Sequence, residues 1–136
     1  PLGEADVKRE GGDATVVAKL LMTHKALSVA AKLAQEGISV EVIDPRTLVP
    51  LDVKTIVKSV KKTGRFIIVE EDNKTGGWGA EVAAIVAEKA VDYLETPIRR
   101  VSAFDTPIPF APALEDFVIP SEDRIAEAIR QMALAS

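Results

Sequence analysis

The sequence contains no cysteine, and among its 136 residues there are only one histidine, one tryptophan and one tyrosine. Without cysteine the chain can form no disulfide, no thiolate metal site and no cysteine nucleophile. Aromatic residues make up only 4% of the chain, which leaves Val, Ile, Leu and Ala to fill the core. Aliphatic cores of this kind are typical of buried parallel sheets. The apolar runs are also much shorter than the roughly 20 residues that a membrane-spanning helix needs.

The distribution of charge does not favour binding of polyanions. A net charge of -4 gives no general attraction to nucleic acid or to anionic membranes. The basic residues that do cluster lack the interleaved aromatic side chains on which single-stranded nucleic acids stack, and they are Lys54, Lys58, Lys61, Lys62 and Arg65. We interpret them as an exposed helix face and expect neither a nucleic-acid nor a membrane partner.

Strand-like and helix-like segments alternate along the chain. Strands are expected at Ala14–Ala18, Ser39–Ile43, Arg65–Val69 and Ile98–Ser102. The first helix is expected from about Thr23 to a C-cap at Gly37, and the second from the N-cap Asp52 to Gly64. Two more helices are expected, one after the turn Thr75–Gly79 and one after the N-cap Ser121. This order predicts right-handed crossovers in a three-layer, Rossmann-like α/β domain with a mostly parallel sheet of about five strands. We assign residues 14–136 to this domain and residues 1–13 to a polar, extended linker.

One long segment lacks either periodicity. About nineteen residues between the last expected strand and the last expected helix contain Phe104, Phe110 and Phe117, three of the four phenylalanines. Pro107 and three further prolines restrict the backbone, so the segment can hold apolar groups in place without secondary structure. A loop of this kind indicates a partner surface, although the phenylalanines could equally fold back onto the domain's own core.

Groups that could support catalysis are few. His24 is the only base with a near-neutral pKa in its free form, and a lone histidine without a motif is more often structural. The Gly76–Gly79 turn stands between a strand and a helix, where backbone N–H groups can bind phosphate, so a nucleotide-binding or phosphate-binding module is the alternative function. Glu70, Glu71 and Asp72 are interpreted as a solvated acidic edge. We expect no catalytic residue, cofactor or metal site in this chain.

Six short stretches, taken in order, resemble the transketolase C-terminal domain family: Val42–Thr47, Pro50–Asp52, Ser59–Arg65, Val69–Glu71, Thr75–Gly77 and Asp105–Phe110. More narrowly, they are similar to the C-terminal domain of the beta subunit in the thiamine-dependent component of pyruvate, branched-chain 2-oxo acid and acetoin dehydrogenase complexes. One departure is Leu20, near which family members often carry a glycine. The resemblance covers nearly the whole chain.

This resemblance implies an assembly role in an oxidoreductase that transfers acyl groups to lipoyl groups. Thiamine diphosphate and Mg²⁺ would bind in the complete enzyme, between N-terminal domains of the alpha and beta subunits. Residues 1–13 would then connect to an N-terminal thiamine-pyrimidine domain. A protein of this kind is expected in the cytoplasm, or in the mitochondrial matrix of a eukaryote.

The resemblance also implies partners: a second beta subunit, the alpha subunit, and the peripheral subunit-binding domain of the acyltransferase core. Because that last domain is basic, its docking surface should offer carboxylates. Glu95 matches an acidic position used by relatives, and Asp92 or the C-terminal tail could serve instead. From the long loop we add Phe104, Asp105, Pro107, Phe110 and Phe117 as interface candidates.

Overall fold

The computed structural model describes residues 3–19, 21–47, 50–73, 78–103 and 120–135. The strands are β1 (Asp6–Arg9), β2 (Ala14–Ala18), β3 (Val40–Asp44), β4 (Phe66–Asn73) and β5 (Arg99–Ala103). The helices are α1 (Leu21–Ala34), α2 (Val53–Thr63), α3 (Gly79–Ala90), the short 3₁₀-helix η1 (Val91–Tyr93) and α5 (Glu122–Ala135).

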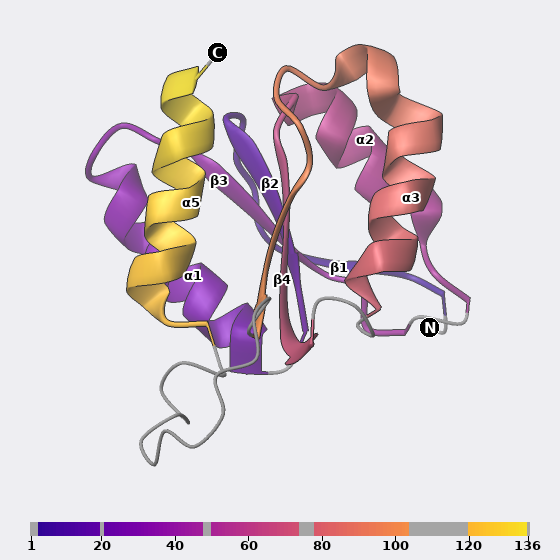
Figure 1. Cartoon of the computed structure of the whole chain (residues 1–136), viewed down its shortest axis with the longest axis horizontal. Coiled ribbons are helices and arrows are strands. Elements are labelled where there is room, and N and C mark those ends of the chain that lie inside the picture. The colour runs from indigo at the N-terminus through magenta and orange to yellow at the C-terminus, as the bar shows by residue number, and fades with distance from the viewer. Residues whose placement is uncertain (1–2, 20, 48–49, 74–77, 104–119, 136) are drawn as a thin grey trace.

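The strands form one sheet in the order β1-β3-β2-β4-β5. Strands β3, β2, β4 and β5 are parallel to one another, and only β1 is antiparallel to its neighbour β3. Helices α1 and α5 cover one face of the sheet, and α2 and α3 cover the other (Figure 1). The three-layer, mostly parallel architecture predicted from the sequence is therefore confirmed.

Two separate cores lie on the two faces of the sheet. Because side chains alternate along a strand, Val16 of β2 packs towards α1 and α5, whereas its neighbour Val17 packs towards α2 and α3. On β4, Ile67 and Ile68 divide between the two cores in the same way. All four side chains are fully buried, which explains why the strands consist of continuous apolar runs.

The helix termini lie where the sequence places them. The Asp52 side chain accepts a hydrogen bond from the Thr55 backbone N–H at 3.1 Å and so caps α2. Gly64 ends the same helix with a φ of 75°, a conformation that favours glycine. At α5, the Ser121 hydroxyl accepts a hydrogen bond from the Arg124 N–H at 3.1 Å. The predicted caps are confirmed.

Strand β1 was not predicted, because its residues fall within the expected linker. Its four residues are polar apart from Val7, and none of them is buried. They join the sheet through backbone pairing with β3, and the Asp52 carboxylate fixes the preceding segment by accepting the Ala5 N–H at 2.9 Å. An edge strand held in this way carries no hydrophobic pattern that a sequence reading could detect.

Candidate interaction site

The predicted acidic docking residues lie at one corner of the molecule. Asp92 is exposed in η1, and Glu95 follows two residues after this helix. The Glu95 backbone N–H donates to the Gly64 carbonyl at 2.7 Å, which attaches the corner to the C-terminal end of α2. The Glu95 side chain remains 54% exposed, so both carboxylates are open to solvent.

Glu95 is nevertheless engaged within the chain. Its carboxylate lies 3.2 Å from the Arg65 guanidinium, which is only 15% exposed. Arg65 also donates to the carbonyls of Asp13 and Met132 at 3.0 and 3.2 Å, and so connects β4 to the segment before β2 and to α5. The arginine thus holds Glu95 in one position and offsets part of its charge, which leaves Asp92 as the more open carboxylate of the corner.

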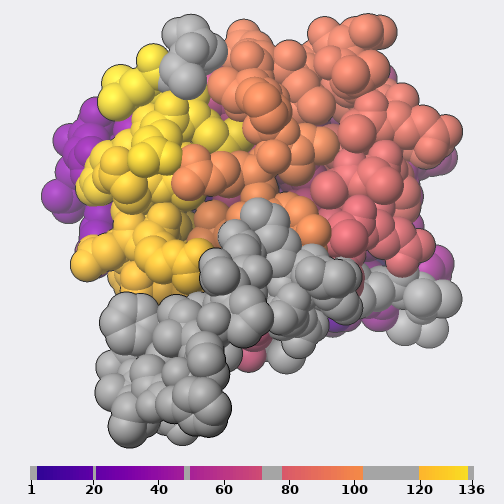
Figure 2. All heavy atoms as spheres, in the orientation of Figure 1, coloured from indigo at the N-terminus to yellow at the C-terminus, as the bar shows by residue number. Residues whose placement is uncertain are grey.

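The remaining interface candidates lie outside the described residues. They are Phe104, Asp105, Pro107, Phe110 and Phe117, all within the 104–119 segment. On the face shown in Figure 2, α5 and α3 lie on either side of the chain around β5, which reaches the surface between them. The strand that leads into this segment is therefore at the edge of the sheet.

Glu70 differs from the prediction of a solvated acidic edge. Its side chain is fully buried and accepts two hydrogen bonds from Arg100, at 3.0 and 2.7 Å. The same carboxylate accepts the backbone N–H of Gly79, the first residue of α3, at 2.9 Å. The prediction fails because Glu70 continues the strand on the α3 side of the sheet, where the neighbouring strand supplies an arginine. Glu71, on the opposite side, is exposed as expected.

This buried carboxylate bears on the alternative of phosphate binding. A helix N-terminus attracts anions through its free N–H groups, but the Gly79 N–H already has an anionic acceptor in Glu70. A Cβ at Gly79 would lie 2.5 Å from the Glu70 carboxylate, so glycine is required by this contact. The structure therefore gives this glycine a packing role. His24 is exposed in the first turn of α1.

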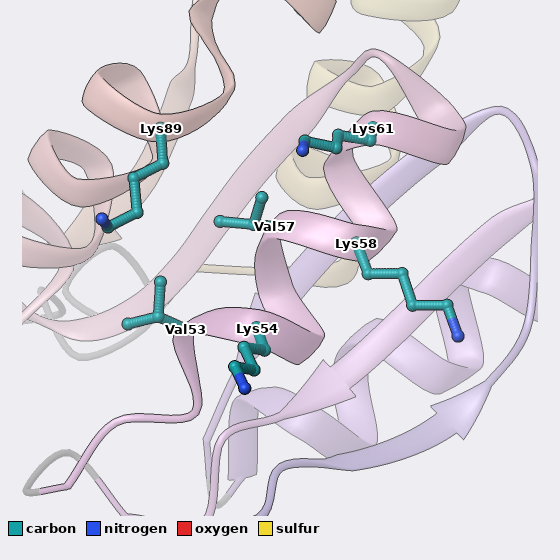
Figure 3. Close-up of a pocket in the computed structure, with 6 residues that line it drawn as sticks. All are labelled: Val53, Lys54, Val57, Lys58, Lys61 and Lys89. Carbon is teal, nitrogen blue, oxygen red and sulfur yellow. The ribbon is translucent and has the colours of Figure 1, made fainter.

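A groove between α2 and α3 was not predicted. It has a volume of about 600 Å³ and is lined by Val53, Lys54, Val57, Lys58, Lys61 and Lys89. Figure 3 shows the two valines projecting from α2 towards α3, while Lys89 approaches from α3. The sequence identified the lysines of α2 as exposed, which is confirmed, but the contribution of Lys89 depends on how the two helices pack.

A polar seam joins α2 to the sheet on the same side of the domain. The buried Thr15 hydroxyl lies 2.6 Å from that of Ser59 and 2.8 Å from that of Thr63. Next to it, the Glu41 carboxylate pairs with Lys62 and accepts the Gly11 N–H at 3.1 Å. Burial raises the pKa of Glu41, but the hydrogen bonds from Lys62, Ser59 and Gly11 outweigh it and lower the pKa below its usual value.

Among the described residues, no group of three or more His, Cys, Asp and Glu side chains is placed to hold a metal ion. No helix of the described part is both long and apolar enough to cross a membrane. The groups that the structure does bring together are the acidic corner at η1 and the lysine-lined groove between α2 and α3.

Fold and site together define a Rossmann-like α/β domain with one antiparallel edge strand. Beside α3 it has two charged surfaces of opposite sign, the acidic corner at η1 and the lysine-lined groove. The chain belongs to the transketolase C-terminal domain family, whose model matches residues 3–125. This match confirms the resemblance seen in the sequence.

Similar proteins include beta subunits of several enzymes. The chain is 45% identical over 132 residues to the beta subunit of acetoin:2,6-dichlorophenolindophenol oxidoreductase from Bacillus subtilis, covering 97% of the chain and 39% of that protein. It is 45% identical over 136 residues to the pyruvate dehydrogenase E1 component subunit beta of Rickettsia felis, covering 100% and 42%. The chain thus spans about two fifths of the length of the relatives it matches.

A solved structure has the same fold. A split-gene transketolase, described as an inactive beta4 tetramer, matches with a TM-score of 0.80 and 30% sequence identity. The match covers 97% of this chain and 43% of that one. In each of these three proteins the chain corresponds to less than half of the whole.

Proposed function

We propose that this chain is the C-terminal assembly domain of the beta subunit of a thiamine diphosphate-dependent 2-oxo acid dehydrogenase. The observation that carries the proposal is the ordered similarity to enzyme beta subunits along the whole chain. The identities to an acetoin-oxidising and a pyruvate-oxidising relative are both 45%, so they do not select a substrate. We place the parent enzyme in the bacterial cytoplasm, or in the mitochondrial matrix of a eukaryote.

In this proposal the domain itself performs no chemistry. Thiamine diphosphate and Mg²⁺ would be held by the N-terminal domains of the alpha and beta subunits, where the cofactor supplies a carbanion-stabilising ring. The described residues of this chain do not fit that cofactor. The N–H of Gly79 at the start of α3 already has an anionic acceptor, and no described carboxylate cluster is placed to bind the metal.

The proposed partners are a second beta subunit, the alpha subunit and the peripheral subunit-binding domain of the acyltransferase. The similar transketolase chain that forms a beta4 tetramer supports self-association. The exposed carboxylates Asp92 and Glu95 suit a basic docking domain, because opposite charges steer association. Phe104, Asp105, Pro107, Phe110 and Phe117 remain proposed contributors to the contacts between subunits.

Sedimentation velocity of the chain, alone and with the subunit-binding domain of an acyltransferase, tests this proposal. We expect self-association or a complex that weakens as salt is raised, because salt screens exposed charges. Asp92→Asn together with Glu95→Gln should weaken docking about tenfold, mainly through slower association. Asp123→Asn, an exposed carboxylate on α5, is the matched control and should leave docking unchanged.

A chain that stays monomeric and does not dock would contradict the assembly role. Titration calorimetry with thiamine diphosphate, NAD and ATP separates this role from the alternative of a nucleotide-binding module. We expect no heat of binding from any of the three. Tight binding of NAD or ATP would favour the alternative, and binding of thiamine diphosphate to this chain alone would contradict the division of roles between the domains.

A further inference from the structure

The groove between α2 and α3 combines apolar surface with positive charge. Val53 and Val57 lie half-buried along it, although each is an apolar residue within a helix that buries its other apolar side chains. Four lysines surround the valines: Lys54, Lys58 and Lys61 from α2, and Lys89 from α3. All four are exposed.

These lysines form no ion pair with any described carboxylate. Several other cations of the described chain do have acidic neighbours: Lys32 is paired with Glu122, and Arg130 with Glu36. At the groove, the Lys61 ammonium instead lies 5.0 Å from the centre of the Tyr93 ring. A chain with a net charge of -4 thus gathers four lysines at this surface without an ion pair to any of them among the described residues.

The apolar surface continues beyond the groove into η1. Tyr93 is 50% exposed, and Val91 at the start of the same short helix is 58% exposed. Because Lys61 lies over the Tyr93 ring, the end of α2 and η1 form one continuous surface. Exposed apolar side chains surrounded by charged groups are typical of a protein contact surface and not of a permanently solvated face.

The geometry suits an extended partner and not a small ligand. Lys54, Lys58 and Lys61 recur at i, i+4 and i+7 and therefore follow α2 for about two turns, or roughly 10 Å. The groove lining consists of flexible lysines and two valines, and none of the six is fully buried. A small ligand would find no rigid polar group there, whereas the two-turn spacing matches one face of a helix.

We propose that the α2–α3 groove binds an acidic, amphipathic helical segment of a partner protein. Its apolar face would cover Val53 and Val57, and its carboxylates would pair with the lysines of both helices. Charge complementarity is the basis for this choice of partner. The inference rests on the groove alone, so it stands or falls independently of the dehydrogenase role. The groove adjoins the acidic corner at Asp92 and Glu95, which has the opposite charge and would attract a basic partner.

The test uses a fluorescent synthetic peptide of about 20 residues with Leu on one helical face and Glu on its flanks. Fluorescence anisotropy measures its binding to the chain. A peptide of the same composition, scrambled so that Leu and Glu no longer occupy separate faces, is the first control. A peptide with Lys in place of Glu is the second. We expect the acidic amphipathic peptide alone to bind, and its affinity to fall as salt is raised.

Lys89→Glu is the decisive variant, with Arg124→Glu as its matched control on α5. Both residues are exposed on helices, have no ion pair with a described residue, and change the net charge equally. Lys89→Glu should weaken binding about tenfold and Arg124→Glu less than about twofold, because only the first charge lies at the groove. Val57→Ser should weaken binding with no change in its salt dependence.

Several results would overturn the proposal. Equal binding of the scrambled peptide, or equal effects of Lys89→Glu and Arg124→Glu, would show attraction to net charge alone. Competition by millimolar inorganic phosphate at constant ionic strength would indicate a small-anion site, and preferential binding to phosphatidylserine vesicles would indicate a membrane surface. Self-association that Lys89→Glu abolishes would assign the groove to a second copy of the chain. Thermal unfolding of each variant verifies that it is folded.

Discussion

The two helix layers cover opposite faces of one sheet, but they are held by different contacts. Between α1 and α5 several charges are paired: Glu122 accepts hydrogen bonds from Ser28 and Lys32, and Arg130 donates to Glu36 just after α1. Along the groove between α2 and α3, by contrast, the lining lysines Lys54, Lys58, Lys61 and Lys89 have no ion pair with a described residue. The first layer thus pairs charges across its two helices, whereas the groove of the second layer exposes lysines and apolar surface.

The two faces of the sheet also differ in the polarity of their buried side chains. Under α1 and α5 the buried side chains of the described strands are apolar, for example Val16, Val42 and Ile67. Under α2 and α3 it carries buried polar groups, among them Thr15, Glu41 and Glu70. The α2–α3 layer is therefore positioned by directional hydrogen bonds, which fix the helices that form the groove and the acidic corner.

The largest expected effect comes from the buried ion pair of the α2–α3 layer. Glu70→Ala removes the carboxylate that binds Arg100 and the Gly79 N–H, and breaking a buried pair costs about 3–5 kcal/mol. Urea unfolding followed by circular dichroism measures this loss. Glu70→Gln should be milder because it keeps an acceptor for Gly79. Glu122→Ala in the other layer should cost under about 1 kcal/mol, since that pair is solvated. Equal losses would contradict the difference between the layers.

The next effect compares apolar side chains of the two layers. Leu33 of α1 is fully buried, so Leu33→Ala should lower the free energy of unfolding by about 2–5 kcal/mol through lost burial and a cavity. Val57 lies half-buried in the groove, so Val57→Ala should cost about 1 kcal/mol or less. The same urea titrations provide both values. A cost at Val57 as large as that at Leu33 would mean that the groove is part of the core.

A smaller effect concerns pH and the polar seam. The pKa of Glu41 lies below its usual value of 4.5 in the folded chain, so the unfolded chain binds the proton more strongly. Glu41 therefore contributes stability that is present above about pH 4.5 and is lost as the pH falls through the lower folded pKa. Glu41→Gln should flatten the decline of stability below pH 5. Unfolding midpoints between pH 7 and pH 3 measure this slope, and Glu88→Gln, at an exposed position on α3, is the control.

The smallest effect is expected from the outer ion pairs of the α1–α5 layer. Arg130→Gln removes the exposed contacts with Glu36 and Glu127. Pairs of this kind add little to stability, and salt screens what they add. The unfolding midpoint should therefore shift only slightly at low salt and converge with that of the unchanged chain at high salt. A large shift that persists in salt would show that this layer depends on its surface charges more than its apolar core suggests.

Much of the fold follows from local patterns. The apolar runs of β2 and β4 indicate where these strands lie, and the caps at Asp52, Gly64 and Ser121 indicate helix termini; the structure confirms them, except that β4 continues beyond Val69 to Asn73. Strand β1 could not be found in this way, because an exposed edge strand is held by backbone pairing and its side chains need no pattern. Glu70 was misjudged for a related reason: a carboxylate at the end of a strand is solvated unless a neighbouring strand supplies its partner.

The candidate site, too, has residues that could be predicted from the sequence and residues that could not. Asp92 and Glu95 came from the family resemblance, and the structure adds that Arg65 holds Glu95 in place. The groove needed Lys89, which lies 28 residues beyond Lys61 and approaches α2 only when α3 packs beside it. No periodicity within one helix can indicate such a contact.

The sequence by itself determined the α/β fold class, most helix and strand positions and the family, because these depend on short-range periodicity, capping chemistry and ordered motifs. Only the tertiary structure decided which charges are neutralised and which remain available. Each of the three charged contacts joins residues that are distant in the sequence. They are the Glu70–Arg100 pair, the Arg65–Glu95 pair and the lysines around Val53 and Val57. The strength of a charge depends on its distance from its partner and on its burial, and the packing of the two helix layers sets both.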